Sequence, residues 1–366
     1  MGARRHARDP ADGSLRQRLK ERIRRHGPLS VADYMGACLS DASGGAYACR
    51  QPIGAAGDFI TAPEISQIFG ELLGLWCVAV WQSMGEPAAI ALAELGPGRG
   101  TLMADALRAW RRVPKFLERV SVVLVETSPV MAEAQRNTLQ DAPVPLNWCA
   151  DLGQLPSGPL ILLANEFIDA LPVRQLVRRG DVWCERVVTL DADGAFAFAK
   201  GEAVSDADLP PAPDGAILET RPAVTELLSV LAARAPMAAL FIDYGHDETG
   251  FGDTLQAVAA HRFADPLGAP GEADLSAHVD FVALRRQAEA LGLHCYGPML
   301  QGAFLLKLGL SARRDRLLQH ATPEQRAAIM SSTTRLVDPR QMGALFKALA
   351  FTSHGLPPPP PFHPGI

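Results

Sequence analysis

This sequence is poor in the features that mark secreted, metal-binding and membrane proteins. Its 366 residues include six cysteines, and no two of them form a C-x-x-C pair, so neither a disulfide framework nor a zinc site is indicated. No apolar run approaches the roughly 20 residues of a membrane-spanning helix, and the first residues lack the apolar core of a signal peptide. We therefore expect a soluble protein with reduced cysteines, no bound metal and no membrane span.

The sequence also lacks an excess of positive charge. Its 35 lysines and arginines against 40 acidic residues give a net charge of −5, whereas binding to nucleic acid requires a basic field. Basic residues do gather between positions 16 and 25, among apolar residues at helical spacing, which predicts a solvated amphipathic helix ended by Gly27. A transit peptide is the alternative, but such peptides are poor in acids, and the first 21 residues contain Asp9, Asp12 and Glu21.

The most informative stretch is LAELGPGRGT at positions 92–101, where an apolar strand ends in an acid and a glycine cluster before a helix begins. Glycines let the backbone turn tightly and approach a ligand, and the start of a helix offers unpaired N–H groups. The dinucleotide fingerprint G-x-G-x-x-G requires a glycine where Thr101 stands, whereas Gly100 comes one residue early. The stretch resembles instead the acid-x-G-x-G-x-G loop that class I methyltransferases use for S-adenosylmethionine (SAM), so SAM is favoured over NAD.

A second acid follows the next predicted strand. Residues 120–125 form a β-branched apolar run of the buried parallel type, which ends at Glu126. A carboxylate there can accept both hydroxyls of a ribose, and each such charged hydrogen bond contributes about 1.5–3 kcal/mol. Dinucleotide folds place an acid at the same point, so Glu126 alone does not separate SAM from NAD. A simple strand-end acid that caps the helix begun at Ser128 is the other interpretation.

Apolar periodicity outlines an α/β core. Strands are predicted at about 89–94, 120–126, 159–164 and 238–243. Residues 65–80 place apolar side chains on one helical face, which predicts a helix packed against the sheet, and Ser30 is the predicted N-cap of an earlier helix.

The stretch from 173 to 215 has short β-rich segments, an Asp193-Gly194 hairpin signal and several prolines, and we interpret it as an insertion beside the core. We predict a helical N-terminal region at 1–86 that packs on the core, a core at 87–172 and 216–310, the β-rich insertion at 173–215, a helical C-terminal region at 311–355 and a proline-rich tail at 356–366.

Several blocks together resemble the MidA family of class I SAM-dependent methyltransferases. The most specific are GDFITAPEISQ at 57–67 and NEFIDALP at 165–172, which accompany the glycine loop and Glu126. Later blocks at 243–246, 265–267, 274–281 and 301–305 extend the resemblance over most of the chain. It implies an α/β fold with a Rossmann-like seven-stranded class I methyltransferase core, a helical N-terminal segment and an inserted α+β region, with SAM as cofactor and a protein arginine as methyl acceptor.

The mitochondrial member of that family assists the assembly of respiratory complex I and methylates an arginine of a hydrophilic-arm subunit. The resemblance therefore implies a complex I subunit as partner, met in the cytoplasm of a bacterium or in the mitochondrial matrix of a eukaryote. The alternatives are a SAM-binding assembly chaperone with little catalytic activity, a methyltransferase for another acceptor, and an NAD-dependent oxidoreductase. The sequence leaves the oligomeric state open.

Cofactor contacts are predicted at the ends of consecutive strands. The first acid and the loop amides would hold the amino acid end of SAM, the second acid its ribose, and the residues after the next short strand the edge of its adenine. Ligands of open α/β sheets bind at the carboxyl ends of the strands. The predicted cofactor-binding residues are Glu94, Gly96, Gly98, Gly100, Thr101, Glu126, Asp151, Leu152 and Asn165.

Methylation of arginine needs a base, because a guanidinium with a pKa above 12 has no free lone pair at pH 7. Carboxylates that orient the guanidinium and take its proton would lower the barrier. Glu166 and Asp169 are the predicted catalytic residues. The alternative is a pair of acids that interact with the dipole of a helix that they start.

Contacts with the acceptor are predicted in three places. Asp58, Thr61 and Glu64 lie on a loop before a helix, which is a common place for a lid. Asp243 and Tyr244 end a buried strand at the same sheet edge, although an aspartate there can simply fix a turn. His278 is either a substrate contact or a structural histidine.

Overall fold

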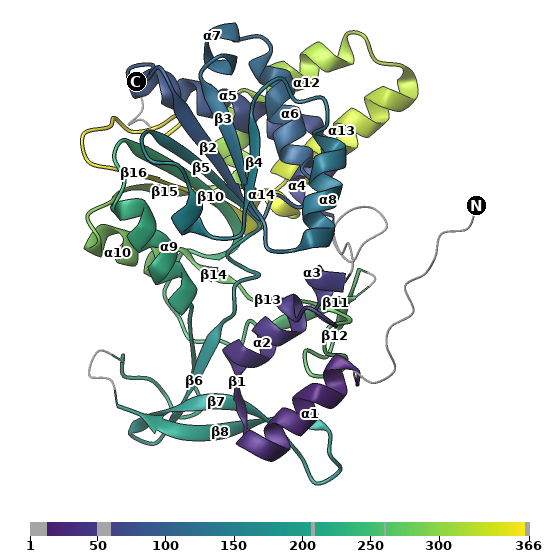
Figure 1. Ribbon diagram of the computed structural model, residues 1–366, viewed down its shortest axis with the longest axis vertical. Helices are drawn as coiled ribbons and strands as arrows, with labels where there is room; N and C mark the ends of the chain where they lie inside the picture. The colour runs from purple at the N-terminus through teal and green to yellow at the C-terminus, as the bar shows by residue number, and fades with distance from the viewer. Residues whose placement is uncertain (1–12, 50–59, 206–208, 260, 363–366) are drawn as a thin grey trace. The chain divides into compact units, whose positions relative to one another are not determined.

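The computed structural model describes residues 13–49, 60–205, 209–259 and 261–362, and the chain divides into two compact units (Figure 1). The smaller unit comprises residues 1–50, 172–220 and 251–275, and the larger unit comprises residues 51–171, 221–250 and 276–366. Each unit is therefore assembled from segments that are far apart in the sequence.

The larger unit is built on a mostly parallel sheet. Seven of its eight described strands follow the spatial order β15-β16-β10-β5-β2-β3-β4, and β16 runs antiparallel to both of its neighbours. A short strand, β14 (Val279–Asp280), pairs with β10 off this path. The bounds are β2 (Ile90–Leu95), β3 (Val120–Val125), β4 (Leu146–Cys149), β5 (Leu160–Asn165), β10 (Met237–His246), β15 (His294–Leu300) and β16 (Phe346–Thr352). The predicted fold class is confirmed.

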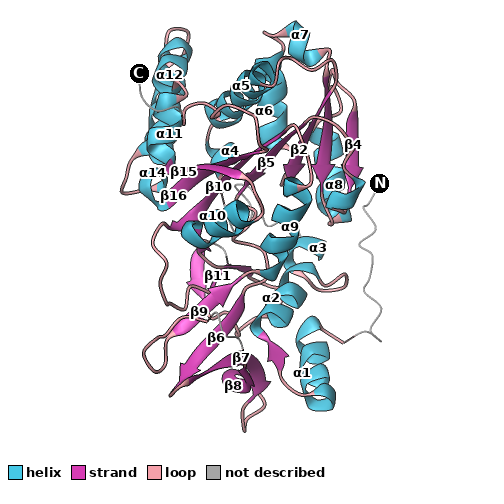
Figure 2. Ribbon diagram, turned by 90° about the vertical axis from the view of Figure 1, so that its left-hand side faces the viewer, coloured by secondary structure: helices cyan, strands magenta, loops and turns pink. Residues whose placement is uncertain are grey.

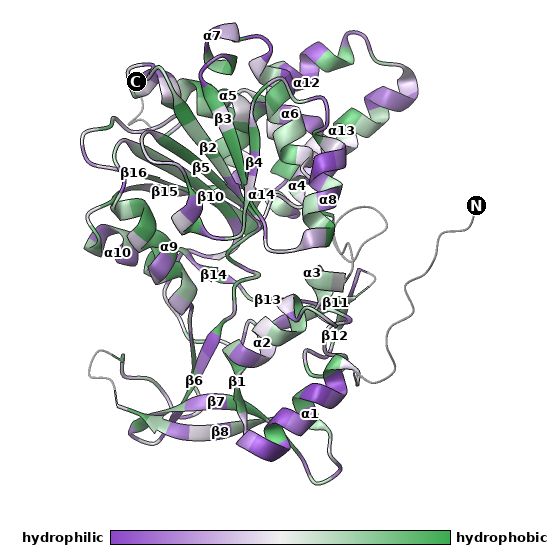
Figure 3. Ribbon diagram, viewed as in Figure 1, coloured by the Kyte–Doolittle hydropathy of each residue, from purple (hydrophilic) through white to green (hydrophobic). Residues whose placement is uncertain are grey.

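The four predicted strands appear as β2, β3, β5 and β10. Helices cover both faces of the sheet, so most side chains of these runs are apolar (Figure 2). One apolar cluster lies against α5 and α6, and a second lies against α9 and α10. Figure 3 shows the central strands in the green of hydrophobic residues. The helices are α4 (Ala62–Ile65), α5 (Gln67–Ser83), α6 (Thr101–Trp110), α7 (Pro114–Leu117), α8 (Pro129–Thr138), α9 (Pro222–Ala232), α10 (Phe281–Ala290), α11 (Gln301–Lys307), α12 (Leu310–Leu318), α13 (Pro323–Val337) and α14 (Met342–Leu345), with a 3-10 turn at Leu152–Gln154.

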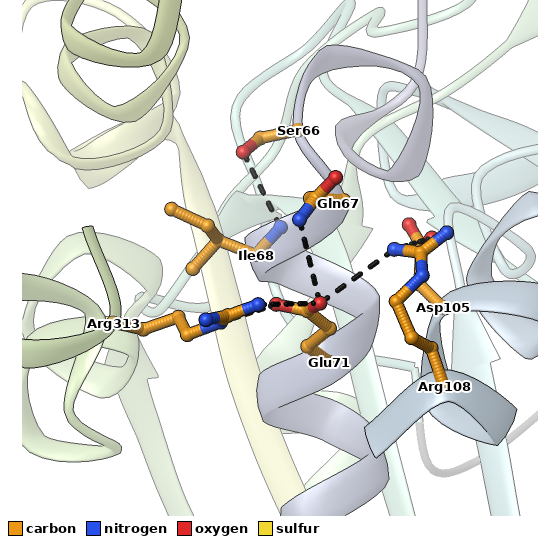
Figure 4. Close-up of polar contacts among 7 residues, drawn as sticks. All are labelled: Ser66, Gln67, Ile68, Glu71, Asp105, Arg108 and Arg313. Atoms are coloured by element: carbon orange, nitrogen blue, oxygen red, sulfur yellow. Dashed lines mark hydrogen bonds and ion pairs between the residues drawn. The ribbon is translucent and has the colours of Figure 1, made fainter. Parts of the chain in front are cut away.

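Helix α5 carries the predicted apolar face and also a buried acid. Glu71 receives two hydrogen bonds from Arg313 of α12, from Nε at 2.7 Å and from a terminal nitrogen at 2.9 Å. Arg108 of α6 lies 3.6 Å from the same carboxylate and 2.8 Å from Asp105 (Figure 4). This cluster of charges joins two consecutive helices, α5 and α6, to α12, which is distant from both in the sequence.

The smaller unit combines helices with two sheets. Helix α1 (Leu15–His26) buries Leu15, Leu19 and Ile23 and is closed by Gly27, as the charge and apolar pattern predicts. Ser30 caps α2 (Val31–Ser40) by accepting the N–H of Asp33. The remaining elements are α3 (Ala46–Cys49), the sheet β1 (Leu29–Ser30), β7 (Val182–Leu190), β6 (Arg174–Arg179) and β9 (Ile217–Thr220), with β8 (Phe196–Val204) beside β7, and the sheet β12 (Arg262–Ala264), β11 (Gln256–Ala259) and β13 (Asp274–Ser276). Ser276, the last residue of β13, belongs to the larger unit.

The predicted boundaries need three corrections. The N-terminal region is split, since residues 1–50 belong to the smaller unit while α4 and α5 belong to the larger one. Residues 216–220 and 251–275, expected in the core, also belong to the smaller unit. Residues 346–352, expected to be helical, form β16, because they pair with β10 and β15 in the sheet. No described helix is long and apolar enough to cross a membrane.

Candidate functional site

The loop between β2 and α6 adopts backbone angles that favour glycine. Gly96, Gly98 and Gly100 all have positive φ, at 55°, 54° and 82°. A Cβ on Gly96 would lie 2.9 Å from the ring of Phe167, so this position also lacks room for a side chain. Gly100 is the N-cap of α6 and has no side chain to cap the helix. The loop therefore presents bare backbone at a helix N-terminus, as expected for a site that binds a charged ligand.

A recess of about 360 Å³, open to solvent, lies beside this loop in the larger unit. The glycine loop, α4 and the carboxyl end of β5 line it. Several of the predicted site residues meet at this recess, namely Thr61, Glu64, Glu94, Gly96, Gly98, Thr101, Asn165 and Glu166. The parallel register explains this convergence, because β2 pairs with β5 and their carboxyl ends lie at one edge.

Two hydrogen-bond acceptors in the recess have no donor among the described residues. They are Oε2 of Glu94 and Oδ1 of Asn165, both shielded from solvent. Burial raises the pKa of Glu94 to about 8. Such acceptors need a ligand that brings N–H donors and positive charge. The α-ammonium group of SAM has these properties, so the residues present fit the predicted cofactor.

Helix α4 forms another side of the recess. Glu64 accepts a hydrogen bond from the Thr101 hydroxyl at 2.5 Å and lies 3.4 Å from a terminal nitrogen of Arg99. These contacts place Glu64 at the start of α6, near the glycine loop. Thr61 is the N-cap of α4, whereas Asp58, predicted on the same loop, lies outside the described residues.

Glu166 directly follows β5 and has a positive φ of 50°, which is strained for a residue with a side chain. Its Oε1 accepts hydrogen bonds from the backbone N–H of Ala62 at 2.8 Å and from the Asn165 amide at 3.1 Å. Burial raises the pKa of Glu166 to about 7, and the charge of Asp169 adds to the increase. A carboxyl with such a pKa can exchange a proton near neutral pH.

Asp243 fixes the turn that carries Glu166. Its Oδ2 accepts three consecutive backbone N–H groups, of Phe167 at 3.2 Å, Ile168 at 2.9 Å and Asp169 at 3.2 Å. Its Oδ1 accepts the N–H of Tyr244 at 2.9 Å. These bonds favour the turn-fixing interpretation of Asp243 over a contact with the acceptor.

Asp169 lies in a polar cluster next to Glu166. Burial raises its pKa to about 6, while the Arg221 guanidinium and the Tyr244 hydroxyl lower it. The Tyr244 hydroxyl also lies 2.5 Å from that of Ser276. The imidazole of His278 meets the Tyr244 ring edge-on at 5.2 Å. The structure thus places Asp169, Tyr244 and His278 in one cluster, and their roles stay predictions.

The residues predicted to hold the nucleoside lie outside the lining of the recess. Glu126 accepts the N–H of Ser128 at 2.7 Å and the side-chain amide of Gln135 at 2.9 Å. Asp151 is exposed and caps the turn at Leu152 by accepting the N–H of Gly153. The roles of Glu126, Asp151 and Leu152 therefore stay predictions.

Sequence reasoning missed two polar residues at this site. Gln135 is fully buried and joins Glu126 to the glycine loop. Arg221 donates to the backbone carbonyls of Ala277 and His278, at 2.7 and 3.0 Å, and lies near Asp169. A glutamine on the apolar side of a predicted helix was an available signal for Gln135. Arg221 gave no such signal, because it precedes a helix distant in sequence from the other site residues.

The solved structures include a close match in fold. A crystal structure from Burkholderia thailandensis bound to S-adenosyl-homocysteine (SAH) has a TM-score of 0.79 and 28% identity, and the match covers 94% of this chain and 92% of that one. Among curated proteins, this chain is 39% identical to a mitochondrial protein arginine methyltransferase NDUFAF7 homolog of Drosophila melanogaster, over 92% of this chain and 84% of that protein. It is 36% identical to human mitochondrial protein arginine methyltransferase NDUFAF7, over 95% and 85%.

A family model of S-adenosyl-L-methionine-dependent methyltransferases matches residues 72–299. This range contains the glycine loop, Glu126, Glu166 and Asp243. Glu126 alone does not separate SAM from NAD, and this match identifies SAM as the cofactor. Together with the relatives that span nearly the whole chain, it shows that this chain belongs to the S-adenosyl-L-methionine-dependent methyltransferase family.

Proposed function

We propose that this chain transfers a methyl group from SAM to an arginine side chain of another protein. The observation that carries the proposal is a pair of partly buried carboxyl groups with raised pKa values, Glu166 and Asp169, at the edge of the sheet where the glycine loop begins. The names of the curated relatives in fly and human support a protein arginine as the acceptor.

The reaction requires two things of the protein, a way to hold the guanidinium and a way to remove its proton. Full deprotonation before the reaction would cost about 7–9 kcal/mol at pH 7, since the pKa of arginine lies above 12. SAM supplies an electrophilic methyl group on a sulfonium. A guanidinium nitrogen forms the new N–C bond as the S–C bond breaks, and one proton must leave that nitrogen.

Glu166 is suited to receive this proton. Its hydrogen bonds from Ala62 and Asn165 both end on Oε1, and its raised pKa makes the ionised form a better base than an exposed glutamate. Arg221 and Tyr244 hold the pKa of Asp169 below the value that burial alone would give. Asp169 therefore stays ionised and attracts the positive guanidinium. Burial strengthens this attraction, since the local dielectric constant is low.

The cofactor contacts follow from the unpartnered acceptors. Glu94 and Asn165 would accept the ammonium N–H groups of SAM, and the N–H groups at the start of α6 would face its carboxylate. Glu126 would accept the ribose hydroxyls, and Asp151 with Leu152 would meet the adenine edge. Thr61, Glu64, Tyr244 and His278 would contact the acceptor.

We further propose a hydrophilic-arm subunit of respiratory complex I as the acceptor protein. The family resemblance of the 57–67 and 165–172 blocks supports this partner. The enzyme would then work in the compartment that contains this arm, the bacterial cytoplasm or the mitochondrial matrix.

The test is a methylation assay on the purified hydrophilic-arm subunits with radiolabelled SAM, followed by mass spectrometry of the product. We expect label on arginine with the wild type and a loss of about 10²–10⁴-fold in turnover for Glu166→Gln. Calorimetry should show that this variant still binds SAH. Glu226→Gln, at an exposed acid of α9, is the matched control.

Unchanged turnover in Glu166→Gln would remove Glu166 from the mechanism. SAH binding without methylation of any subunit, by wild type as well, would favour the assembly chaperone. Label on another residue type would contradict the arginine assignment.

A further inference from the structure

Gln135 lies where the two halves of the cofactor site approach each other. Its side chain, on the inner face of α8, is fully buried. Its Nε2 donates to the carbonyl of Gly98 in the glycine loop at 2.8 Å and to Oε2 of Glu126 at 2.9 Å. Its Oε1 accepts the indole N–H of Trp148 on β4 at 2.9 Å. One amide therefore connects the loop, the acid after β3, and the next strand.

The chemistry of these three partners permits only one orientation of the amide. Nε2 has two hydrogens, and both face acceptors, while Oε1 faces a donor. A flipped amide would place Oε1 against the Gly98 carbonyl and the Glu126 carboxylate, and Nε2 against the Trp148 N–H. The hydrogen-bond pattern thus determines the amide orientation.

The hydrogen bonds of Gln135 constrain both groups that we assign to cofactor binding, the backbone of Gly98 and the carboxylate of Glu126. The Gly98 carbonyl belongs to a loop residue with a φ of 54°, and a hydrogen bond from a buried side chain holds its peptide plane. The Glu126 carboxylate is held at both oxygens, by the N–H of Ser128 and by Gln135. Each carboxylate oxygen accepts more than one hydrogen bond, so Glu126 retains capacity for the ribose hydroxyls while its orientation is fixed.

We propose that Gln135 is a positioning residue for SAM, which sets the glycine loop and the Glu126 carboxylate at a fixed separation before the cofactor binds. Gln135 acts through Gly98 and Glu126 and need not touch the cofactor. The inference rests on the cofactor contacts proposed above, and it is independent of the identity of the methyl acceptor.

The experiment compares SAH affinity and thermal stability in the full chain. Gln135→Met keeps the length of the side chain but removes both donors and the acceptor. Trp148→Phe removes only the third hydrogen bond and leaves the bonds to Gly98 and Glu126 in place. Asn137→Met, at an exposed position of the same helix, controls for a polar-to-apolar change on α8.

We expect Gln135→Met to weaken SAH binding about tenfold or more by calorimetry. The free energy of a hydrogen bond from an amide to a carboxylate corresponds to at least about a tenfold change in affinity. Trp148→Phe and Asn137→Met should bind SAH within about twofold of wild type. Wild-type affinity in Gln135→Met would overturn the proposal. Equal weakening in Trp148→Phe would also overturn it, since the packing of α8 on β4 would then be the cause.

Gln135→Glu provides a second readout if the methionine variant does not fold. At pH 8 its carboxylate would face the Glu126 carboxylate and the Gly98 carbonyl, so SAH binding should fall below that of wild type. At pH 5.5 a protonated carboxyl can donate to one of these acceptors again, and binding should recover in part. No difference between the two pH values, relative to wild type, would contradict the proposal. Failure of the wild type to bind SAH would instead contradict the cofactor assignment itself.

Discussion

The Asp243 carboxylate accepts the backbone N–H of Ile168 at 2.9 Å, and the N–H groups on either side converge on the same oxygen. Asp243 lies near the carboxyl end of β10, and Ile168 lies in the turn that follows β5, the parallel strand beside it. This contact holds the turn after β5, including the positive φ of Glu166. A structural acid thus supports the conformation of the acid that we propose as the catalytic base.

Replacement of Asp243 by asparagine should therefore damage both stability and catalysis. An amide offers one oxygen where the carboxylate uses two, so at least one buried N–H group loses its acceptor. We expect a loss of about 2–3 kcal/mol in the free energy of unfolding, measured by urea denaturation. Turnover should fall more than SAH affinity, because the turn carries Glu166. Asp193→Asn, at an exposed hairpin position, is the control, and a neutral effect of Asp243→Asn would contradict the assigned role.

The pH dependence of turnover should report Glu166. Its pKa is raised to about 7 by burial, and a base must be ionised to act. Turnover with saturating SAM should therefore rise about tenfold per pH unit below pH 7 and level off above about pH 8. Residual turnover in Glu166→Gln should lack this step. A pH profile that is the same in wild type and variant would assign the titration to another group.

Stability without cofactor should decrease as the pH rises through the pKa of Glu94. Burial raises this pKa to about 8, above its value in the unfolded chain, so the folded state holds the proton more tightly and loses stability when the proton leaves. Relative to Glu94→Gln, the melting temperature of the wild type should decline between pH 5.5 and 8.5. Saturating SAH should reduce this decline, because in the proposed site its ammonium group would pair with the ionised carboxylate. A constant difference between the two proteins, with and without SAH, would argue against this linkage.

The ion pair between Glu71 and Arg313 should be strongly coupled. Both of its hydrogen bonds are shorter than 3 Å, and the Glu71 side chain is only 5% exposed (Figure 4). Arg313→Met removes a positive charge that compensates the buried Glu71 carboxylate, and we expect the free energy of unfolding to fall by about 1–3 kcal/mol. The double variant Glu71→Met with Arg313→Met should be more stable than the sum of the single effects predicts. Urea denaturation of the four proteins gives the coupling, Arg316→Met serves as the exposed control, and strict additivity would contradict a direct pair.

Local patterns were sufficient to predict much of the fold. The apolar runs at β2, β3, β5 and β10 are buried on both faces, and such strands can be recognised without knowing their neighbours. Helix α1 shows its buried face at regular spacing and its end at Gly27. The glycine loop was identifiable for the same reason, since its positive φ angles require residues without a Cβ.

Local sequence patterns could not predict how the site is assembled from distant segments of the chain. Residues 346–352 have an apolar pattern that suits a helix or a buried strand, and only pairing with β10 and β15 decides for the strand. Similarly, the smaller unit draws on three separate segments of the chain.

By itself, then, the sequence determined the four strands β2, β3, β5 and β10, the glycine loop, the candidate acids and the cofactor class, because each depends on residue type and short-range spacing. Only the tertiary structure decided that Asp243 supports a turn, that Gln135 links the loop to Glu126, and that Arg221 lies near Asp169. Hydrogen bonds and electrostatic interactions between residues distant in sequence depend on which elements become neighbours in the folded chain, and no local pattern carries that information.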